Sequence, residues 1–308
     1  MMTNRIQNTY IAEKRKIYHF SFDNFTQMNN YGKNWSFFNI YRFGRKPFSG
    51  PYDIYQHQHL QVANAIYEDG LMYRGYASKD TITLVLIIDK HGSLTANGKP
   101  LKHGEILIID DKKYEISFSH YVQIGTVTMT KEFVNEYFPY LYHKINRVYT
   151  DSNNALSDQV RSIINLKENQ DTYMKLRVIK SIESLSLDKQ EEIQKKLSRK
   201  EALIFSIRNY ILENLEENID IQDLTLKFGI SDKTLQSAFK KFLGYTPKKF
   251  IKLLKLNLAY RDIVTNNGTK GIVSKTAIKY GFNNFGLFSR EYKRMYGVLP
   301  SETGRGSR

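Results

Sequence analysis

The sequence of 308 residues contains no cysteine, which excludes both disulfide bonds and thiolate metal sites. It also lacks a long apolar run, since the longest, near Leu84–Ile88, is far too short to cross a bilayer. The first ten residues lack the apolar core of a signal peptide. From these absences we expect a cytoplasmic protein with no membrane partner.

Signatures of catalysis are missing as well. The chain has no P-loop, no Gly-x-Ser-x-Gly motif and no His-Glu-x-x-His motif, so we expect neither an enzyme nor a cofactor. Acidic residues are few: 31 Asp and Glu stand against 46 Lys and Arg, which gives a net charge of +15. Such an excess favours a polyanionic partner, most often nucleic acid.

The N-terminal half has the pattern of short strands. Residues 81–88 are rich in β-branched side chains, and residues 114–119 alternate with period two. Between them lies Asn97-Gly98, the strongest short signal for a hairpin. Short strands with regular turns predict a sandwich or a small barrel over residues 35–130.

From residue 131 the apolar residues recur at helical spacing instead. Helices are predicted at 155–166 and 171–186, within a helical linker that reaches residue 198. The apolar residues of this linker could form a core, or they could form a contact between two subunits. The second interpretation rests on a spacing like that of a heptad repeat, seen at Leu176, Ile179, Glu183 and Leu187. A homodimer would allow two copies to bind direct repeats or a palindrome.

The C-terminal third contains a duplication, in which residues 284–300 repeat the pattern of residues 231–247. The matched pairs are Leu235 with Phe288, Phe239 with Tyr292, Gly244 with Gly297, and Pro247 with Pro300. Each copy follows a short helical pattern that a glycine ends, and each begins with a residue that caps helices, Ser231 or Asn284. This order is typical of a helix-turn-helix, and two such units would fit two successive major grooves of one DNA duplex.

The charge and the outward side chains of the duplication support DNA as the partner. Residues 225–300 hold 15 Lys and Arg against 3 Asp and Glu, a net charge of +12. Helical spacing leaves Lys233, Gln236 and Ser237 outward in the first copy. In the second copy it leaves outward Phe285, Gly286 and Arg290. Arg and Lys suit guanine, Gln suits adenine, and an apolar ring suits the thymine methyl group.

Residues 201–303 resemble the DNA-binding domain of AraC/XylS-type transcription regulators. The resemblance is carried by Asp223-Leu224 through Gly229, Leu235 through Phe239, Gly244-Tyr245-Thr246-Pro247, Leu256-Asn257-Leu258-Ala259, Ala277 through Phe282, and Phe288 through Thr303. It covers about a third of the chain. It implies seven helices, with a long one at about 248–264 that joins two helix-turn-helix units. It also implies RNA polymerase as a partner and activation as the more frequent outcome.

The resemblance assigns roles by position. Lys233, Gln236 and Ser237 become base readers of the first unit, and Phe285, Gly286 and Arg290 take the corresponding places in the second. Gly286 offers no side chain, so the second unit is expected to bind more through phosphates and Arg290. The expected phosphate contacts are Lys240, Lys241, Lys248, Lys249, Lys252, Lys293 and Arg294, so affinity should fall steeply with salt.

The N-terminal half resembles, less sharply, the cupin-like β domain that AraC-type regulators often carry to bind an effector or to dimerise. Side chains suited to a carboxylate, phosphate or nucleotide are Tyr41, Arg42, Arg45, Tyr55 and Arg74. His57 and His59 have the spacing that places two imidazoles on one face of a strand. The further ligands that a metal would need, Glu68 with His103 or His120, are poorly spaced, so no metal is expected.

The sequence therefore predicts an α+β protein: an N-terminal β-rich, cupin-like sandwich or barrel, a helical linker and an all-α domain with two helix-turn-helix units. The expected segments are an extension 1–34, the β-rich domain 35–130, the linker 131–198, the DNA-binding domain 199–303 and a flexible tail or expression scar 304–308. The predicted function is a sequence-specific regulator of transcription that binds double-stranded DNA, with a small-molecule effector. Two alternatives stay open: a metal- or sugar-binding cupin enzyme, and a nucleoid protein without sequence preference.

Overall fold

The computed structural model describes residues 16–22, 39–44, 50–163, 173–185, 198–217 and 219–303. These residues fall into two compact units. The N-terminal unit holds two β-sheets and the helices of the linker, and the C-terminal unit holds the remaining helices with two short stretches, 41–44 and 69–72. The predicted tail 304–308 lies outside the described residues.

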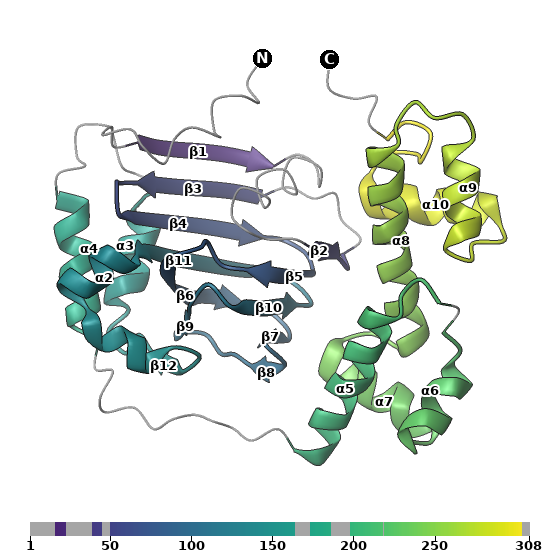
Figure 1. The fold of residues 1–308 in the computed structure, drawn as a ribbon, viewed down its shortest axis with the longest axis horizontal. Coiled ribbons are helices and arrows are strands. Elements are labelled where there is room, and N and C mark those ends of the chain that lie inside the picture. Colours follow the sequence, from purple (N-terminus) through teal and green to yellow (C-terminus); the bar gives the residue numbers. More distant parts are fainter. Residues whose placement is uncertain are drawn as a thin grey trace. The chain divides into compact units, whose positions relative to one another are not determined.

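The larger sheet of the N-terminal unit has seven strands in the order β1-β3-β4-β11-β6-β9-β12 (Figure 1). They are β1 (Lys16–Phe22), β3 (Gly50–Gln56), β4 (Leu60–Tyr67), β6 (Thr81–Lys90), β9 (Glu105–Ile109), β11 (Val122–Thr130) and β12 (Val148–Thr150). Each neighbouring pair is antiparallel. Strand β1 pairs with β3 although it precedes residue 35, where the β-rich domain was expected to begin.

The smaller sheet has five strands in the order β2-β5-β10-β7-β8. They are β2 (Asn39–Arg42), β5 (Leu71–Tyr76), β7 (Leu94–Ala96), β8 (Lys99–Pro100) and β10 (Lys113–Phe118). Asn97 and Gly98 connect β7 to β8 with positive φ values of 47° and 77°. Two central residues with positive φ are what a tight hairpin turn requires, so the predicted Asn-Gly hairpin is confirmed.

One face of the larger sheet packs against the helices of the linker. They are α2 (Lys131–Tyr137), the 3₁₀ helix η2 (Pro139–Lys144), α3 (Ala155–Ser162) and α4 (Met174–Glu183). Val62, Leu84 and Val127 of the sheet share one buried cluster with Val160 and Val178 of the helices. Most apolar positions of the linker therefore form core within this unit.

Of the heptad-like positions, this packing buries one and leaves others exposed. Ile179 is buried, whereas Leu176 is 53% exposed and Glu183 is exposed. Leu187 lies outside the described residues. A seam between two subunits would need these positions on one face, and α4 instead uses Ile179 for its own core.

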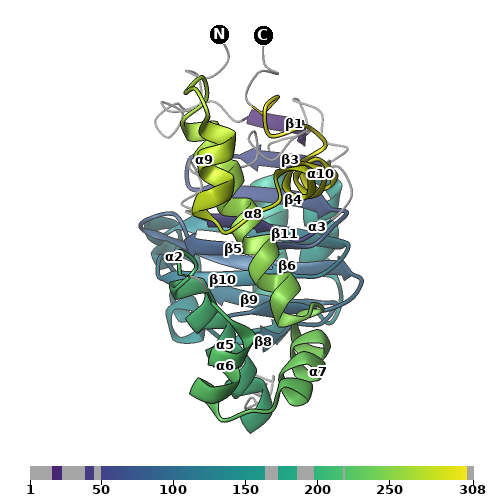
Figure 2. The same ribbon diagram turned by 90° about the vertical axis from the view of Figure 1, so that its right-hand side faces the viewer.

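The helices of the C-terminal unit are α5 (Arg199–Glu213), α6 (Ile221–Phe228), α7 (Asp232–Leu243), α8 (Pro247–Thr265), α9 (Ile272–Lys279) and α10 (Phe285–Tyr296). Helix α8 runs from the α6–α7 pair to the α9–α10 pair (Figure 2). Between Ser198 and Thr303 the described residues form six α-helices, one fewer than the seven that the resemblance implies. Residues 300–303 form turns.

Candidate DNA-binding surface and ligand cavity

Helices α7 and α10 are structural copies of each other. Both have 12 residues, and both start after a capping side chain that accepts the backbone N–H three residues on, Ser231 at 3.3 Å and Asn284 at 2.8 Å. Both end at a glycine in the left-handed region, Gly244 with φ 78° and Gly297 with φ 79°. The same start and stop chemistry therefore produces the duplication that the sequence predicts.

The inner faces of the two helices hold them to the domain core. The buried residues of α7 are Leu235, Ala238 and Phe239, and those of α10 are Phe288, Tyr292 and Met295. In α10 the hydroxyl of Tyr292 lies 2.8 Å from Oγ1 of Thr303, and burial raises the pKa of Tyr292. Fixing these faces inward leaves the opposite face of each helix at the surface.

The predicted base readers lie on those outer faces, in the first turns of each helix. Lys233 and Ser237 are exposed, and Gln236 is half-buried with its Nε2 donating to Oδ1 of Asp232 at 3.2 Å. Phe285 is 46% exposed, an unusual position for a large ring. Gly286 and Arg290 are exposed as well. Each trio thus shares one accessible surface of its own helix.

The predicted phosphate contacts divide into two groups. Lys240, Lys241, Lys248, Lys293 and Arg294 are exposed, whereas Lys249 and Lys252 are half-buried. Nζ of Lys252 lies 2.5 Å from Oε1 of Glu291, a carboxylate whose side chain is only 12% exposed. Lys252 therefore forms an ion pair that links α8 to α10, a role that the sequence did not indicate.

A second ion pair fixes α9 to α8. Nζ of Lys279 lies 2.8 Å and the hydroxyl of Tyr280 lies 2.9 Å from Oδ2 of Asp262. The hydrogen bond to Asp262 raises the pKa of Lys279, so this lysine stays charged. Two cations that the sequence analysis passed over, Lys270 and Lys275, are exposed at the start of the second unit. The excess positive charge of the stretch was the one signal that could have found them.

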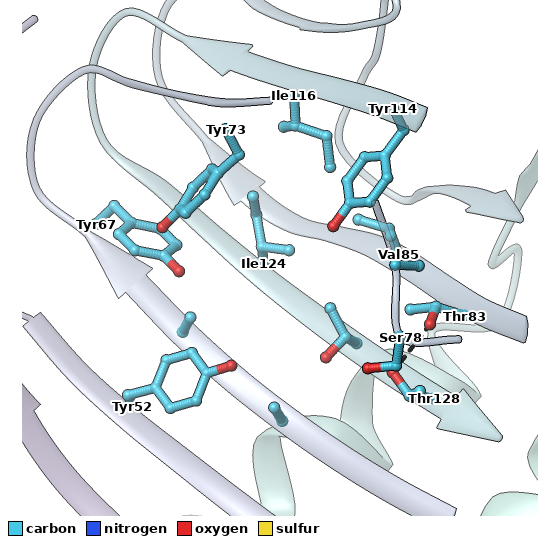
Figure 3. Close-up of a pocket in the computed structure, with 14 residues that line it drawn as sticks. Tyr52, Tyr67, Tyr73, Ser78, Thr83, Val85, Tyr114, Ile116, Ile124 and Thr128 are labelled. Carbon is cyan, nitrogen blue, oxygen red and sulfur yellow. Dashed lines mark hydrogen bonds between the residues drawn. The ribbon is translucent and has the colours of Figure 1, made fainter. Parts of the chain in front are cut away.

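The N-terminal unit contains a cavity of about 80 Å³ between its two sheets (Figure 3). Strands β3, β4, β6 and β11 of the larger sheet and β5 and β10 of the smaller one contribute side chains, together with the loop after β5. The lining consists of Tyr52, Ala63, Ala65, Tyr67, Tyr73, Ala77, Ser78, Thr83, Val85, Tyr114, Ile116, Ile124, Thr126 and Thr128. We call this space the ligand cavity.

Strand alternation explains why the ligand cavity exists. Side chains of one strand alternate between faces, so Ala63 and Ala65 face the cavity while Val62 faces the helices. Across the strands, Ala63 lies opposite Thr126, and Ala65 lies opposite Tyr52. Small side chains thus occupy the centre of the sheet, where larger ones would fill the space between the sheets.

Of the effector residues predicted from the sequence, the four that the structure describes do not line this cavity. Tyr55 is fully buried on the face that packs against the linker helices. Nε of Arg74 lies 3.8 Å from Oε2 of Glu115. Tyr41 and Arg42 belong to the C-terminal unit, where the backbone N–H of Arg42 donates to Oδ1 of Asn257 at 2.8 Å. Arg45 lies outside the described residues.

The histidine pair also differs from its expected setting. His57 and His59 lie in the turn between β3 and β4 rather than along a strand, and Nδ1 of His59 lies 3.2 Å from Oγ1 of Thr130. In the described residues no three His, Asp or Glu side chains gather closely enough to hold a metal ion. No helix in the same part of the chain combines the length and apolar character that crossing a bilayer needs.

Comparison with known proteins points to the C-terminal helices. A family of helix-turn-helix domains matches residues 224–306. The XylDLEGF operon transcriptional activator 1 of Pseudomonas putida is 34% identical over 96 residues, 31% of this chain and 29% of that protein. The HTH-type transcriptional activator RhaS of Mannheimia succiniciproducens is 30% identical over 93 residues, 30% of this chain and 34% of that protein.

A solved structure matches the same part of the chain. The crystal structure of a probable AraC family transcriptional regulator from Rhodopseudomonas palustris is 34% identical, with a TM-score of 0.32. The match covers 35% of this chain and 98% of that one. The chain spans only about three tenths of the length of the curated relatives, so the likeness concerns the C-terminal unit.

Proposed function

We propose that this chain, whose C-terminal domain belongs to the AraC/XylS family of helix-turn-helix domains, is a sequence-specific regulator of transcription. Its relatives are named as transcriptional activators, and we infer activation for this chain too. The observation that carries the proposal is the duplication of α7 and α10, each with an exposed outer face in a stretch of net charge +12.

In each reading helix some residues contact bases and others contact phosphates. The base readers are Lys233, Gln236 and Ser237 on α7, and Phe285 and Arg290 on α10. Phosphates attract the exposed lysines and Arg294 further along the helices, and these contacts supply affinity without sequence information. Lys252 contributes less than the others, because Glu291 already balances its charge.

The remaining parts of the proposal concern control. The N-terminal unit binds a small-molecule effector in the ligand cavity, the regulator acts as a homodimer on two half-sites, and RNA polymerase is its partner in the cytoplasm. No catalytic role is included. The cavity supports the effector, because it places hydroxyl groups in an otherwise apolar lining between the two sheets.

Selection of bound DNA from a random-sequence pool by the full-length protein, at about 150 mM salt, a physiological ionic strength, tests the proposal. We expect an enriched motif with two boxes one helical turn apart, or a doubled arrangement for a dimer. Binding without any enriched motif would instead indicate a nucleoid protein without sequence preference.

Matched variants separate base reading from general attraction. Gln236→Ala should weaken binding to the enriched site by roughly 1–3 kcal/mol and relax specificity at one position. Lys248→Ala should weaken specific and random DNA alike and lower the salt slope by about one. Lys200→Ala, on the exposed surface of α5, removes the same charge and should leave both quantities near those of the wild type.

A further inference from the structure

We propose that the ligand cavity selects a small, uncharged molecule that carries hydroxyl or amide groups on a compact frame, and that it discriminates against carboxylates and phosphates. This inference rests on the proposed function, in which the N-terminal unit binds an effector. It also differs from the sequence analysis, in which aromatic and cationic side chains suited a carboxylate, phosphate or nucleotide.

The described residues that line the ligand cavity are polar or apolar, and none of them is charged. Of these 14 residues, eight carry hydroxyl groups: four tyrosines, three threonines and Ser78. The other six are alanines, isoleucines and a valine. Figure 3 shows the tyrosine rings around the space, with Ser78, Thr83 and Thr128 gathered at one end. Hydroxyl groups both donate and accept hydrogen bonds, so this lining suits groups that do the same.

Charged residues adjoin the lining in sequence but face away from it. Asp53 follows Tyr52, Arg74 follows Tyr73 and Glu115 follows Tyr114, and neighbours on a strand point to opposite faces. These three already have partners outside the cavity. Oδ1 of Asp53 lies 2.7 Å from Nδ1 of His19, and Arg74 lies 3.8 Å from Glu115. Among the described residues a buried anion in the cavity would therefore meet no cation to balance it, which is costly.

The pKa values of the tyrosines also indicate that the cavity is buried away from water. Burial raises the pKa of Tyr67 to about 12 and holds those of Tyr73 and Tyr114 well above the usual value. Their hydroxyls are neutral at physiological pH, as those of ordinary tyrosines are. Desolvation, the cause of these shifts, would penalise a bound carboxylate in the same way.

The size and shape of the cavity limit the ligand further. A volume of about 80 Å³ lies well below the roughly 300–1,000 Å³ of sites for drug-sized molecules, so the ligand is small. The rings of Tyr67 and Tyr73 meet edge to face at 5.7 Å, and Phe118 backs both of them. A compact frame with an apolar side would pack against this wall of rings.

Isosteric pairs of an amide and the matching carboxylate test the selection by charge. Thermal unfolding of the full-length protein is measured with benzamide against benzoate and with isobutyramide against isobutyrate, at equal ionic strength and millimolar concentration. We expect at least one amide to raise the unfolding midpoint and its carboxylate to leave it unchanged. An equal or larger rise with a carboxylate, or no rise with either amide, would overturn the proposal.

Two variants on one strand locate the binding. Tyr52→Phe removes a hydroxyl that faces the ligand cavity, and Tyr55→Phe removes one from the opposite face of β3. The shift caused by the amide should shrink at least severalfold in Tyr52→Phe and persist in Tyr55→Phe, each compared with its own ligand-free midpoint. Equal shifts in both variants would place the amide elsewhere and refute the assignment.

The outcomes for the ligand and for DNA are independent. An enriched DNA motif together with preferred binding of carboxylates would refute only the ligand class. Selective binding of an amide by a protein that selects no DNA motif would refute the regulator instead.

Discussion

At position 286 we expect alanine to favour stability of the fold and glycine to favour DNA binding. Gly286 is the second residue of α10, it does not have a positive φ, and a Cβ built on it would meet only Oδ1 of Asn284, at an ordinary 3.5 Å. Nothing in the fold therefore requires glycine here. Because alanine is favoured over glycine inside a helix, we expect Gly286→Ala to stabilise the protein by about 0.5–1 kcal/mol.

The same substitution should harm DNA binding. A residue without a side chain in the first turn of a reading helix lets the backbone approach the base edges and phosphates closely. The added methyl group would hold α10 away from the groove. A loss of roughly 1.4 kcal/mol, which is about tenfold in affinity, lies at the lower end of what one good base contact contributes.

Urea unfolding measures the change in stability of Gly286→Ala. Binding to the selected DNA site, at one fixed salt concentration, measures its change in affinity. Ser206→Ala on the exposed part of α5 is the control, since it also improves helix propensity but lies outside both reading helices. If Gly286→Ala gains stability and binds DNA like the wild type, the start of α10 does not enter a groove, and the role inferred for Phe285 fails with it.

Further predictions concern stability. Asn284→Ala removes the cap of α10 and should cost about 1 kcal/mol in urea unfolding, and a cost near zero would mean that water replaces the cap. Glu291→Gln should cost about 1 kcal/mol and flatten the dependence of stability on salt, since Lys252 loses its partner; an unchanged salt dependence would refute that pairing. The raised pKa of Tyr67 stabilises the folded protein fully below pH 10, the usual tyrosine value, and this contribution is lost as pH rises to about 12. Urea unfolding at a series of alkaline pH values should show that loss, and Tyr67→Phe should reduce it.

The C-terminal domain could be predicted from the sequence because its signals are local. A capping residue, an apolar face and a terminal glycine lie within one helix, and each acts on its own neighbours in the chain. Ser231 and Gly244 are enough to define α7, and Asn284 and Gly297 define α10 in the same way. The number of helices shows the limit of this reasoning, since the family pattern implied seven where the described residues between Ser198 and Thr303 form six.

The ligand cavity could not be predicted, because it depends on pairs of residues far apart in sequence. Period-two alternation says that Ala63 and Thr126 each lie on one face of a strand, but not that they lie opposite each other. That pairing follows from the order of the strands, and so does the placement of Tyr52 opposite Ala65. Residues chosen for their chemistry alone, such as Tyr55, therefore need not lie on the face that lines the cavity.

The net charge of the C-terminal domain can be counted from the sequence, but the positions of its charged side chains cannot. The sequence gives the total for residues 225–300, but the surface that DNA meets depends on where the three acidic side chains lie. Asp232 accepts from Gln236, Asp262 from Lys279 and Tyr280, and Glu291 from Lys252. Asp262 and Glu291 are thus paired with lysines within the domain, whereas Asp232 keeps its negative charge at the exposed start of α7. The cations on the outer faces of α7 and α10 outnumber this one exposed anion, and from this arrangement we expect salt-sensitive binding of DNA.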